Sequence, residues 1–207
     1  KSFGLFALSI FALVLVMGMG SAVTLAEWTL NTDAVATTVN ANVNAGNLIA
    51  GSGVSAVTPT FGTNGVNYTG WETNTFNAND YYQVTLAPKS NFNFVINSIS
   101  FAHITTNAGT NINMVLSWSK NSDFSSATNL TLNDSVAEDV QSTSSATGLN
   151  IPINNGETIF LRIFGFAAEA VGDTLAIENL VLDGTVTSTS TLSETSICAF
   201  DNGVTAN

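Results

Sequence analysis

The sequence predicts an all-β fold, an antiparallel, jelly-roll-like β-sandwich of about nine strands preceded by an N-terminal hydrophobic signal helix. Two observations predict the sandwich. Apolar residues recur with a period of two through the middle of the chain, and Asn, Thr and Ser make up 73 of the 207 residues. These three residue types favour strands and turns over helices. After the N-terminal run, no helix-length periodic segment occurs.

Residues 1–26 have the three parts of a secretory signal. Lys1 precedes 25 residues without a charge, residues 5–17 are almost wholly apolar, and small residues follow. Cleavage after Ala22 or after Ala26 fits this pattern. The alternative is a retained anchor helix, since a run of this length can cross about 30 Å of hydrocarbon. We therefore expect a secreted or cell-surface protein, which contacts the membrane only through this segment if it is uncleaved.

Residues 27–186 are expected to form the sandwich domain. Apolar runs bounded by Gly, Asn, Asp and Ser clusters predict its strands. The predicted strands are 27–30, 48–57, 81–86, 92–104, 112–119, 129–132, 149–153, 158–166 and 174–186.

Three of these strands also indicate which faces are buried. One face of 112–119 carries large apolar side chains, so Trp118 is expected in the core. Both faces of 158–166 are apolar, which predicts a central strand that is covered on both sides. The strand 92–104 changes phase near residues 97–98, which predicts a β-bulge.

Several stretches carry a resemblance to a known kind of module. They are residues 80–88, 99–101, 116–119 with 123–124, 156–165 and 174–186. In these stretches the chain resembles uncharacterised secreted jelly-roll-like β-sandwich modules of archaeal and bacterial surface proteins, which are similar in shape to carbohydrate-binding modules. The resemblance covers about residues 27–186. It implies a jelly-roll-like module at the start of a longer surface protein.

Residues 187–207 are interpreted as a Thr/Ser linker followed by the truncated start of a further region. Cys198 is the only cysteine. An odd cysteine in an exported chain suggests a partner that is absent or intermolecular.

The residue inventory disfavours an enzyme. His103 is the only histidine, and it continues the alternation of Ile99 and Phe101, so we expect a structural, partly buried histidine rather than a catalytic one. Glycoside hydrolysis needs only two facing carboxylates, so a carboxylate-based hydrolase stays the third hypothesis. Its candidates, none marked by a pair spacing, are Glu72, Asp80, Glu157, Glu169, Asp173, Glu178 and Asp183.

Calcium is the one cofactor that the sequence suggests, because hard oxygen ligands are abundant. The candidate ligands lie on or beside predicted strands and are Asp80, Asp173, Glu178, Asn179 and Asp183. The alternative is solvated turn acids, with one carboxylate paired to Arg162. As the only arginine, on a strand that is apolar on both faces, Arg162 is expected to form such a pair.

Sugar binding would use aromatic platforms rimmed by Asn, Asp and Gln. Trp71, Tyr81 and Tyr82 are the candidates, with core packing as the alternative for Trp71. Adjacent strand residues point to opposite faces, so only one of the two tyrosines can face the core. Sequons at Asn67, Asn129 and Asn133 are candidate glycosylation sites.

These observations predict a non-catalytic extracellular binding or adhesion module, with a glycan or a surface protein as partner. The alternative is a self-assembling subunit of a surface layer or filament, in which residues near 27–57 donate a strand to a neighbouring copy. Nucleic acid is excluded as a partner, because a net charge of −11 with four basic residues offers no cationic surface.

Overall fold

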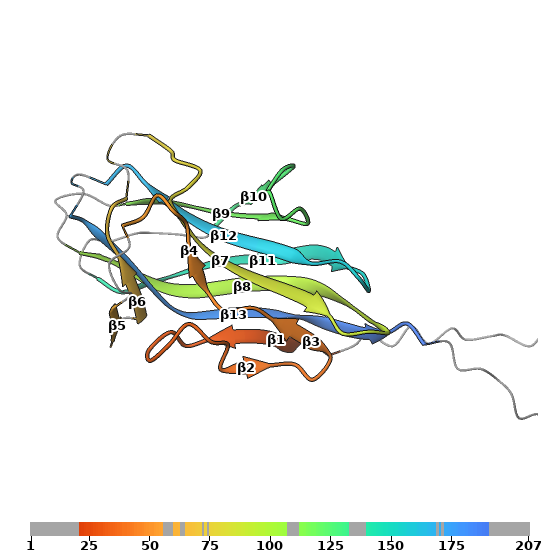
Figure 1. The fold of residues 1–207 in the computed structure, drawn as a ribbon. Helices are drawn as coiled ribbons and strands as arrows, with labels where there is room; N and C mark the ends of the chain where they lie inside the picture. Colours follow the sequence, from red (N-terminus) through yellow and green to blue (C-terminus); the bar gives the residue numbers. More distant parts are fainter. Residues whose placement is uncertain are drawn as a thin grey trace, which may run out of the picture.

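Two antiparallel sheets pack face to face in the computed structural model, as predicted (Figure 1). The structure describes residues 21–55, 60–62, 65–71, 73, 75–106, 112–132, 140–168, 170 and 172–190. The predicted signal helix up to residue 20, Cys198 and most of the linker lie outside these residues. Within them, no helix is long and apolar enough to cross a membrane.

The seven-stranded sheet is built around the last strand, β13 (Thr174–Ser188). Its main order is β11 (Ser142–Ile153), β8 (Phe92–Thr106), β13, β1 (Val23–Trp28) and β2 (Thr38–Val39). The strand β6 (Gly65–Tyr68) also pairs with β13, and β5 (Thr60–Gly62) pairs with β6.

The six-stranded sheet has β12 (Ile159–Phe166) at its centre. Its order is β10 (Thr128–Leu130), β9 (Asn113–Ser119), β12, β7 (Tyr81–Pro88) and β3 (Val43–Ala45), and β4 (Ile49–Ala50) also pairs with β7. The central position predicted for the strand at 158–166 is confirmed.

Several strand boundaries differ from the prediction. The first strand begins at Val23 rather than residue 27, and both Leu25 and Ala26 are fully buried against β13. Within the described part of the predicted strand 48–57, residues 48–55, only the two residues of β4 form a strand, and a turn follows at residues 52–53. The strand β11 begins at Ser142, seven residues before the predicted strand 149–153. Its first half is rich in Ser and Thr and lacks the large apolar side chains that would have revealed a period of two. The short strands β2, β3, β5 and β6 were not predicted.

The predicted bulge in β8 is present. Ser98 pairs with Asp183 and Ile96 pairs with Gly184, so Asn97 is the extra residue between them. Trp118 is half-buried and packs against the core rather than lying inside it.

A close contact between Trp71 and Gly165 marks one end of the core. Trp71 is 0% exposed, and its Nε1 donates a hydrogen bond to the Tyr68 carbonyl oxygen at 2.9 Å. Gly165 occupies an inward position of β12, where a Cβ would lie 2.7 Å from Trp71 Cε3. Because the indole fills the space that a side chain would need, glycine is the residue that fits.

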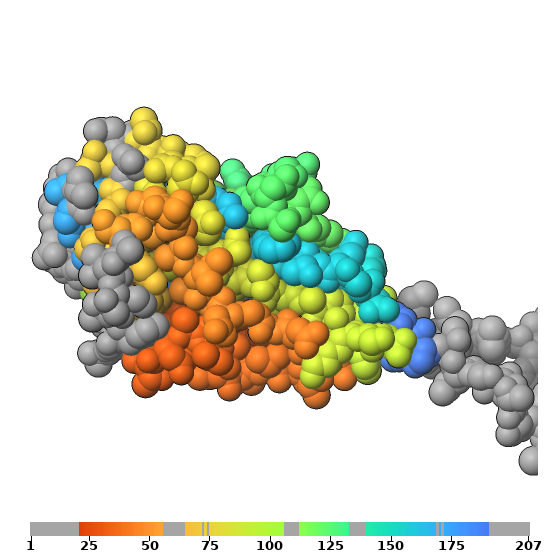
Figure 2. Space-filling model, viewed as in Figure 1, coloured from red at the N-terminus to blue at the C-terminus, as the bar shows by residue number. Residues whose placement is uncertain are grey.

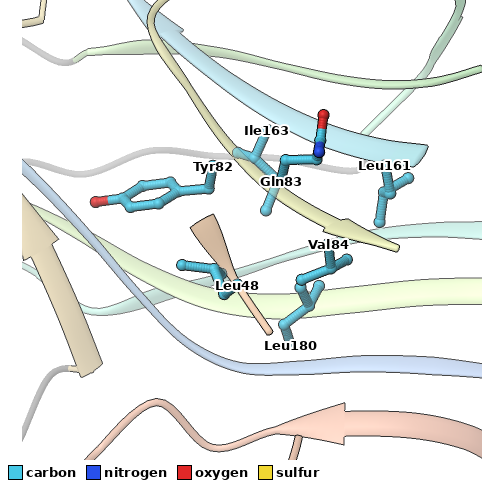
Figure 3. A pocket seen from close by; sticks show the side chains of 7 residues that line it. All are labelled: Leu48, Tyr82, Gln83, Val84, Leu161, Ile163 and Leu180. Carbon is cyan, nitrogen blue, oxygen red and sulfur yellow. The ribbon is translucent and has the colours of Figure 1, made fainter. Parts of the chain in front are cut away.

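A narrow apolar crevice lies between the sheets near β4 and has no room for a water molecule. Leu48, Val84 and Leu180 face one another across it, while the Gln83 amide points away from them (Figure 3). The crevice is therefore part of the core, and Gln83 belongs to the opposite face of the six-stranded sheet.

Candidate functional site

The candidate site is the outer face of the six-stranded sheet, defined here by the outward positions of β7, β12 and β9. On β7 and β12 the inward positions are defined by Tyr82, Val84, Leu161 and Ile163, which belong to the core cluster between the sheets. The outward residues are Tyr81, Gln83, Thr85 and Ala87 on β7, Phe160, Arg162, Phe164 and Phe166 on β12, and Asn113, Val115, Ser117 and Ser119 on β9.

One row of side chains crosses five strands of this face. The strand register places Ile49 beside Gln83, Gln83 beside Arg162, Arg162 beside Ser117, and Ser117 beside Asn129. Four inter-strand spacings give the row a length of about 19 Å. This row, from Ile49 to Asn129, is called the transverse row below.

Arg162 lies at the middle of the transverse row and is held on three sides. Its Nε donates a hydrogen bond to Gln83 Oε1 at 2.7 Å. Its guanidinium carbon is 3.9 Å from the ring centroid of Tyr81 and 4.1 Å from that of Phe124. Partial burial lowers the pKa of Arg162 below its ordinary value. The guanidinium is thus stacked between two rings.

The predicted ion pair of Arg162 with a carboxylate is wrong for the described residues. The neighbours that the strand register gives Arg162 are Gln83 and Ser117, both neutral. The cation is therefore stabilised by an amide oxygen and two ring faces instead of by an anion.

Asn129 presents a second polar group at the end of the row. The Ser117 hydroxyl donates a hydrogen bond to Asn129 Oδ1 at 2.6 Å. Ser117 is buried and Asn129 is exposed. The buried hydroxyl therefore holds the exposed amide by its oxygen, which leaves the Nδ2 group of Asn129 as the donor toward solvent.

Aromatic rings gather beside the row. Phe164 is at the centre of the cluster, with ring centroids 5.0 Å from Phe76, 5.7 Å from Tyr81 and 5.8 Å from Phe124. Phe76 also packs edge-on against Phe166 at 5.8 Å and is 52% exposed. The segment before β7 (yellow) and the β9–β10 connection (green) project beside β12 (light blue) in Figure 2.

Of the predicted sugar platforms, only Tyr81 lies on this face. Trp71 and Tyr82 are 0% and 1% exposed, so neither ring face can reach a ligand. The Tyr82 hydroxyl donates to the Leu175 carbonyl oxygen at 2.5 Å, and burial raises the pKa of this tyrosine well above its ordinary value. Both residues are core, which corrects their assignment as ligand platforms.

The five predicted calcium ligands do not form one site. Asp173 and Asp183 are ten residues apart along β13 and its approach, about 30 Å in extended chain. Asp173 Oδ2 accepts from the Ala170 amide at 2.8 Å, and Asp183 accepts from Thr24 Oγ1 at 2.9 Å. Glu178 accepts a hydrogen bond from the Gln141 side chain. Asn179 is an exposed bulge residue with φ 49°, and Asp80 is buried just before β7. Within the part of the chain that the structure describes, no group of three or more His, Cys, Asp or Glu side chains is placed to hold a metal ion.

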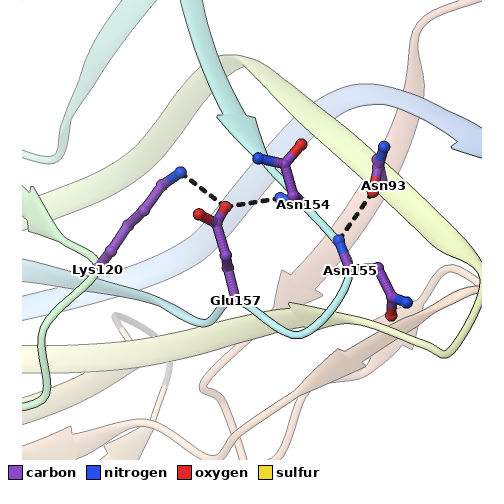
Figure 4. A network of polar contacts seen from close by, with 5 residues as sticks. All are labelled: Asn93, Lys120, Asn154, Asn155 and Glu157. Carbon is purple, nitrogen blue, oxygen red and sulfur yellow. Dashed lines mark hydrogen bonds and ion pairs between the residues drawn. The ribbon is translucent and has the colours of Figure 1, made fainter.

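Other predicted site residues have structural surroundings. His103 is 1% exposed in β8 and its ring packs 5.9 Å from Phe101, so it is more deeply buried than expected. Glu157 accepts hydrogen bonds from the Asn154 amide and from Lys120 Nζ, both at 2.7 Å, in the turn between β11 and β12 (Figure 4). These two contacts lower the pKa of Glu157. Glu72 and Glu169 lie outside the described residues.

The sequons fall in three different places. Asn67 is half-buried within β6, between β5 and β13. Asn129 is exposed on β10 and belongs to the transverse row. Asn133 lies outside the described residues.

No family model matches the chain, and no curated protein matches it. Among solved structures, the chain is similar to a mutant of the carbohydrate-binding module CBM29-2 complexed with cellulohexaose. The two are 16% identical over 70% of this chain and 93% of that chain, with a TM-score of 0.35. At this level the likeness assigns no ligand to the chain.

Proposed function

We propose that the chain is a non-catalytic, extracellular glycan-binding module that uses the outer face of the six-stranded sheet. The observation that carries the proposal is the transverse row, in which four polar side chains follow Ile49 and aromatic rings lie beside them. Sugars present apolar ring faces and a rim of hydroxyl groups. A surface that joins aromatic rings to oriented hydrogen-bond donors is complementary to both.

The dimensions of the face suit an extended ligand. The row is about 19 Å long and crosses the strands, so a chain of several sugar units would lie over it. Phe76, which is 52% exposed, offers apolar contact, and Arg162 and Asn129 offer donors. Gln83 and Ser117 are buried beneath these donors and hold them in place before a ligand arrives, which reduces the entropy lost on binding.

The placement of the carboxylates supports binding rather than hydrolysis. Of the hydrolase candidates that the structure describes, Asp80 and Asp173 are buried, and Glu178 and Asp183 belong to β13 in the other sheet. Glu157 lies in a turn and pairs with Lys120. None of these five occupies an outward position of β7, β12 or β9.

Export through a cleaved signal is part of the proposal. Because β1 begins at Val23 and buries Leu25 and Ala26, cleavage after Ala22 leaves the sandwich whole, whereas cleavage after Ala26 removes most of this strand. Of the two sites that the sequence suggests, we favour the first.

Glycan binding is tested with single aromatic substitutions on the face. A panel of plant and microbial polysaccharides is tested by affinity electrophoresis, and then Phe76→Ala and Tyr81→Ala are compared with wild type. Each substitution is expected to weaken binding about three- to tenfold, the worth of one aromatic contact. Val39→Ala is the control, because Val39 is 40% exposed on β2 of the other sheet.

Two results would contradict the proposal. One is that wild type retains mobility on every polysaccharide of the panel. The other is that Val39→Ala weakens binding as much as the two aromatic substitutions, since the ligand would then lie elsewhere.

A further inference from the structure

Arg162 carries a charge that the described residues leave without a counter-ion. Its Nε is bonded to the neutral Oε1 of Gln83, and the faces of its guanidinium are covered by Tyr81 and Phe124. Within the described residues, no hydrogen bond or ion pair involves the two terminal nitrogens, Nη1 and Nη2. These nitrogens are the edge of a planar cation whose orientation is already fixed.

The other basic residues of the described chain have different surroundings. Lys120 forms an ion pair with Glu157 at 2.7 Å, and Lys89 donates to the Ala41 carbonyl oxygen at 2.8 Å at the end of β7. Arg162 is thus the basic residue on the outer face. It is half-buried, so the cation has lost part of its hydration, and this burial lowers its pKa.

A planar, partly dehydrated guanidinium favours one kind of ligand group. Its fork of N–H donors matches the two oxygens of a carboxylate, with two parallel hydrogen bonds of the charge-assisted kind. The stacking rings and Gln83 have already fixed the plane of the fork, so little side-chain entropy remains to be lost when an anion binds.

Asn129 provides a second hydrogen-bond donor along the transverse row. Its strand, β10, lies two strand spacings from β12, which is about 10 Å between the backbones, and its Nδ2 group is also a donor. A glycan whose carboxylate pairs with Arg162 would therefore bring an acceptor oxygen of a neighbouring sugar unit toward Asn129.

Two carboxylates, those of Asp80 and Asp123, adjoin the residues that pack on Arg162. Asp80 precedes Tyr81 but is fully buried, and Asp123 precedes Phe124 with its carboxylate bonded to the Ser125 amide at 2.9 Å. The net charge of −11 acts at longer range, where physiological salt screens it beyond about 8 Å.

Building on the proposed glycan-binding function, we infer that the ligand is an acidic glycan, in which the carboxylate of a uronic acid unit forms a bidentate salt bridge with Arg162.

The experiment compares one polymer in two charge states. Binding of wild type to polygalacturonate and to its fully methyl-esterified form is measured by isothermal titration calorimetry, with alginate as a second uronate and dextran sulfate as a non-carboxylate polyanion. Arg162→Gln and Arg162→Lys are compared with Lys120→Gln, which changes the net charge by the same amount as Arg162→Gln. Thermal denaturation of each variant reports whether it is folded.

Wild type is expected to bind polygalacturonate, alginate or both. If it binds polygalacturonate, the affinity is expected to be about 10- to 100-fold higher than for the methyl ester. Arg162→Gln is expected to lose that preference, Arg162→Lys to keep part of it, and Lys120→Gln to keep all of it. The ester comparison is made on wild type, so it stands even if an Arg162 variant fails to fold.

Four outcomes overturn the inference. Equal binding of the acid and the ester, or tight binding of neutral polysaccharides that is unchanged in Arg162→Gln, would leave glycan binding intact but remove the acidic ligand. Equal binding of dextran sulfate would show that the site takes any polyanion. Absence of binding to every charged and neutral polymer would overturn the proposed function itself.

Discussion

Trp71 and Gly165 give the sharpest test of the packing between the sheets. The indole is fully buried, donates to the Tyr68 carbonyl and packs against Tyr82 with ring centroids 5.3 Å apart. A Cβ added at Gly165 would lie 2.7 Å from Trp71 Cε3 and 3.0 Å from Cζ3. We therefore predict that Gly165→Ala is more destabilising while the indole is present than after its removal.

The magnitudes follow from the contacts. Trp71→Ala removes a large buried ring and leaves a cavity, at a cost of about 3–5 kcal/mol in the free energy of unfolding. Gly165→Ala inserts a methyl group where the ring cannot move away, at a cost of about 1–3 kcal/mol. In the double variant the methyl group enters the space that the indole has left. The double variant should then be more stable than the sum of the single effects predicts, by about 1–2 kcal/mol.

Urea denaturation followed by far-ultraviolet circular dichroism measures all four proteins, with thermal denaturation as a second readout. Trp71→Ala should lower Tm by about 6–20 °C for a domain of this size. Single effects that add to within about 0.5 kcal/mol would refute the contact, because distant residues behave in that way. A Tm within about 1 °C of wild type for Trp71→Ala would refute the burial of the indole.

Two further predictions concern the ends of strands. The Asn154 amide and Lys120 lower the folded-state pKa of Glu157. The ionised carboxylate therefore stabilises the folded state above the unfolded-state pKa near 4.5, and this contribution is lost as the pH falls through the folded-state pKa. Glu157→Gln should therefore be less stable than wild type at pH 7, with a difference that shrinks below pH 4.5 in urea denaturation; a difference that grows on acidification would contradict the role of the carboxylate. A chain that begins at Val23 should keep the stability of the longer form. A chain that begins at Glu27 lacks the buried residues Leu25 and Ala26, so its Tm should be at least about 5 °C lower. Equal Tm values for the two chains would contradict the pairing of β1 with β13.

The sequence predicted the sheets because burial leaves a local trace. A period of two is visible in β7, β9 and β12 without knowledge of their neighbours, and the phase change at Asn97 predicted the bulge in β8. Short strands such as β2 and β3 carry too few residues for a period to appear. The strand β1 was shortened because its first residues continue the apolar run of the expected signal.

The candidate site was harder to predict because it depends on non-local pairing. Arg162 and Gln83 become neighbours only when β12 and β7 pair in their observed register. Phe76 and Phe124 lie in connections, where no period indicates which way a ring points. The one available signal was the outward spacing of Phe160, Arg162, Phe164 and Phe166, which was interpreted as burial on both sides.

The choice of Trp71 and Tyr82 as platforms failed for a related reason. Aromatic residues serve cores and ligand sites equally well, and only the partner strands decide between the two uses. For the tyrosine pair, the alternation rule required one core residue and one surface residue, and the structure assigns these positions to Tyr82 and Tyr81 respectively.

The pairing of the first strand with the last has a consequence for how the chain is made. Thr24 and Asp183 are bonded across a separation of 159 positions, so the inner edge of β1 has no partner until β13 has been synthesised. At ordinary rates of synthesis that delay is about 10–30 s. Domains dominated by such distant contacts also fold slowly once complete. Under the export proposed above, the order of the strands would keep this edge of β1 unpaired while the chain is translocated.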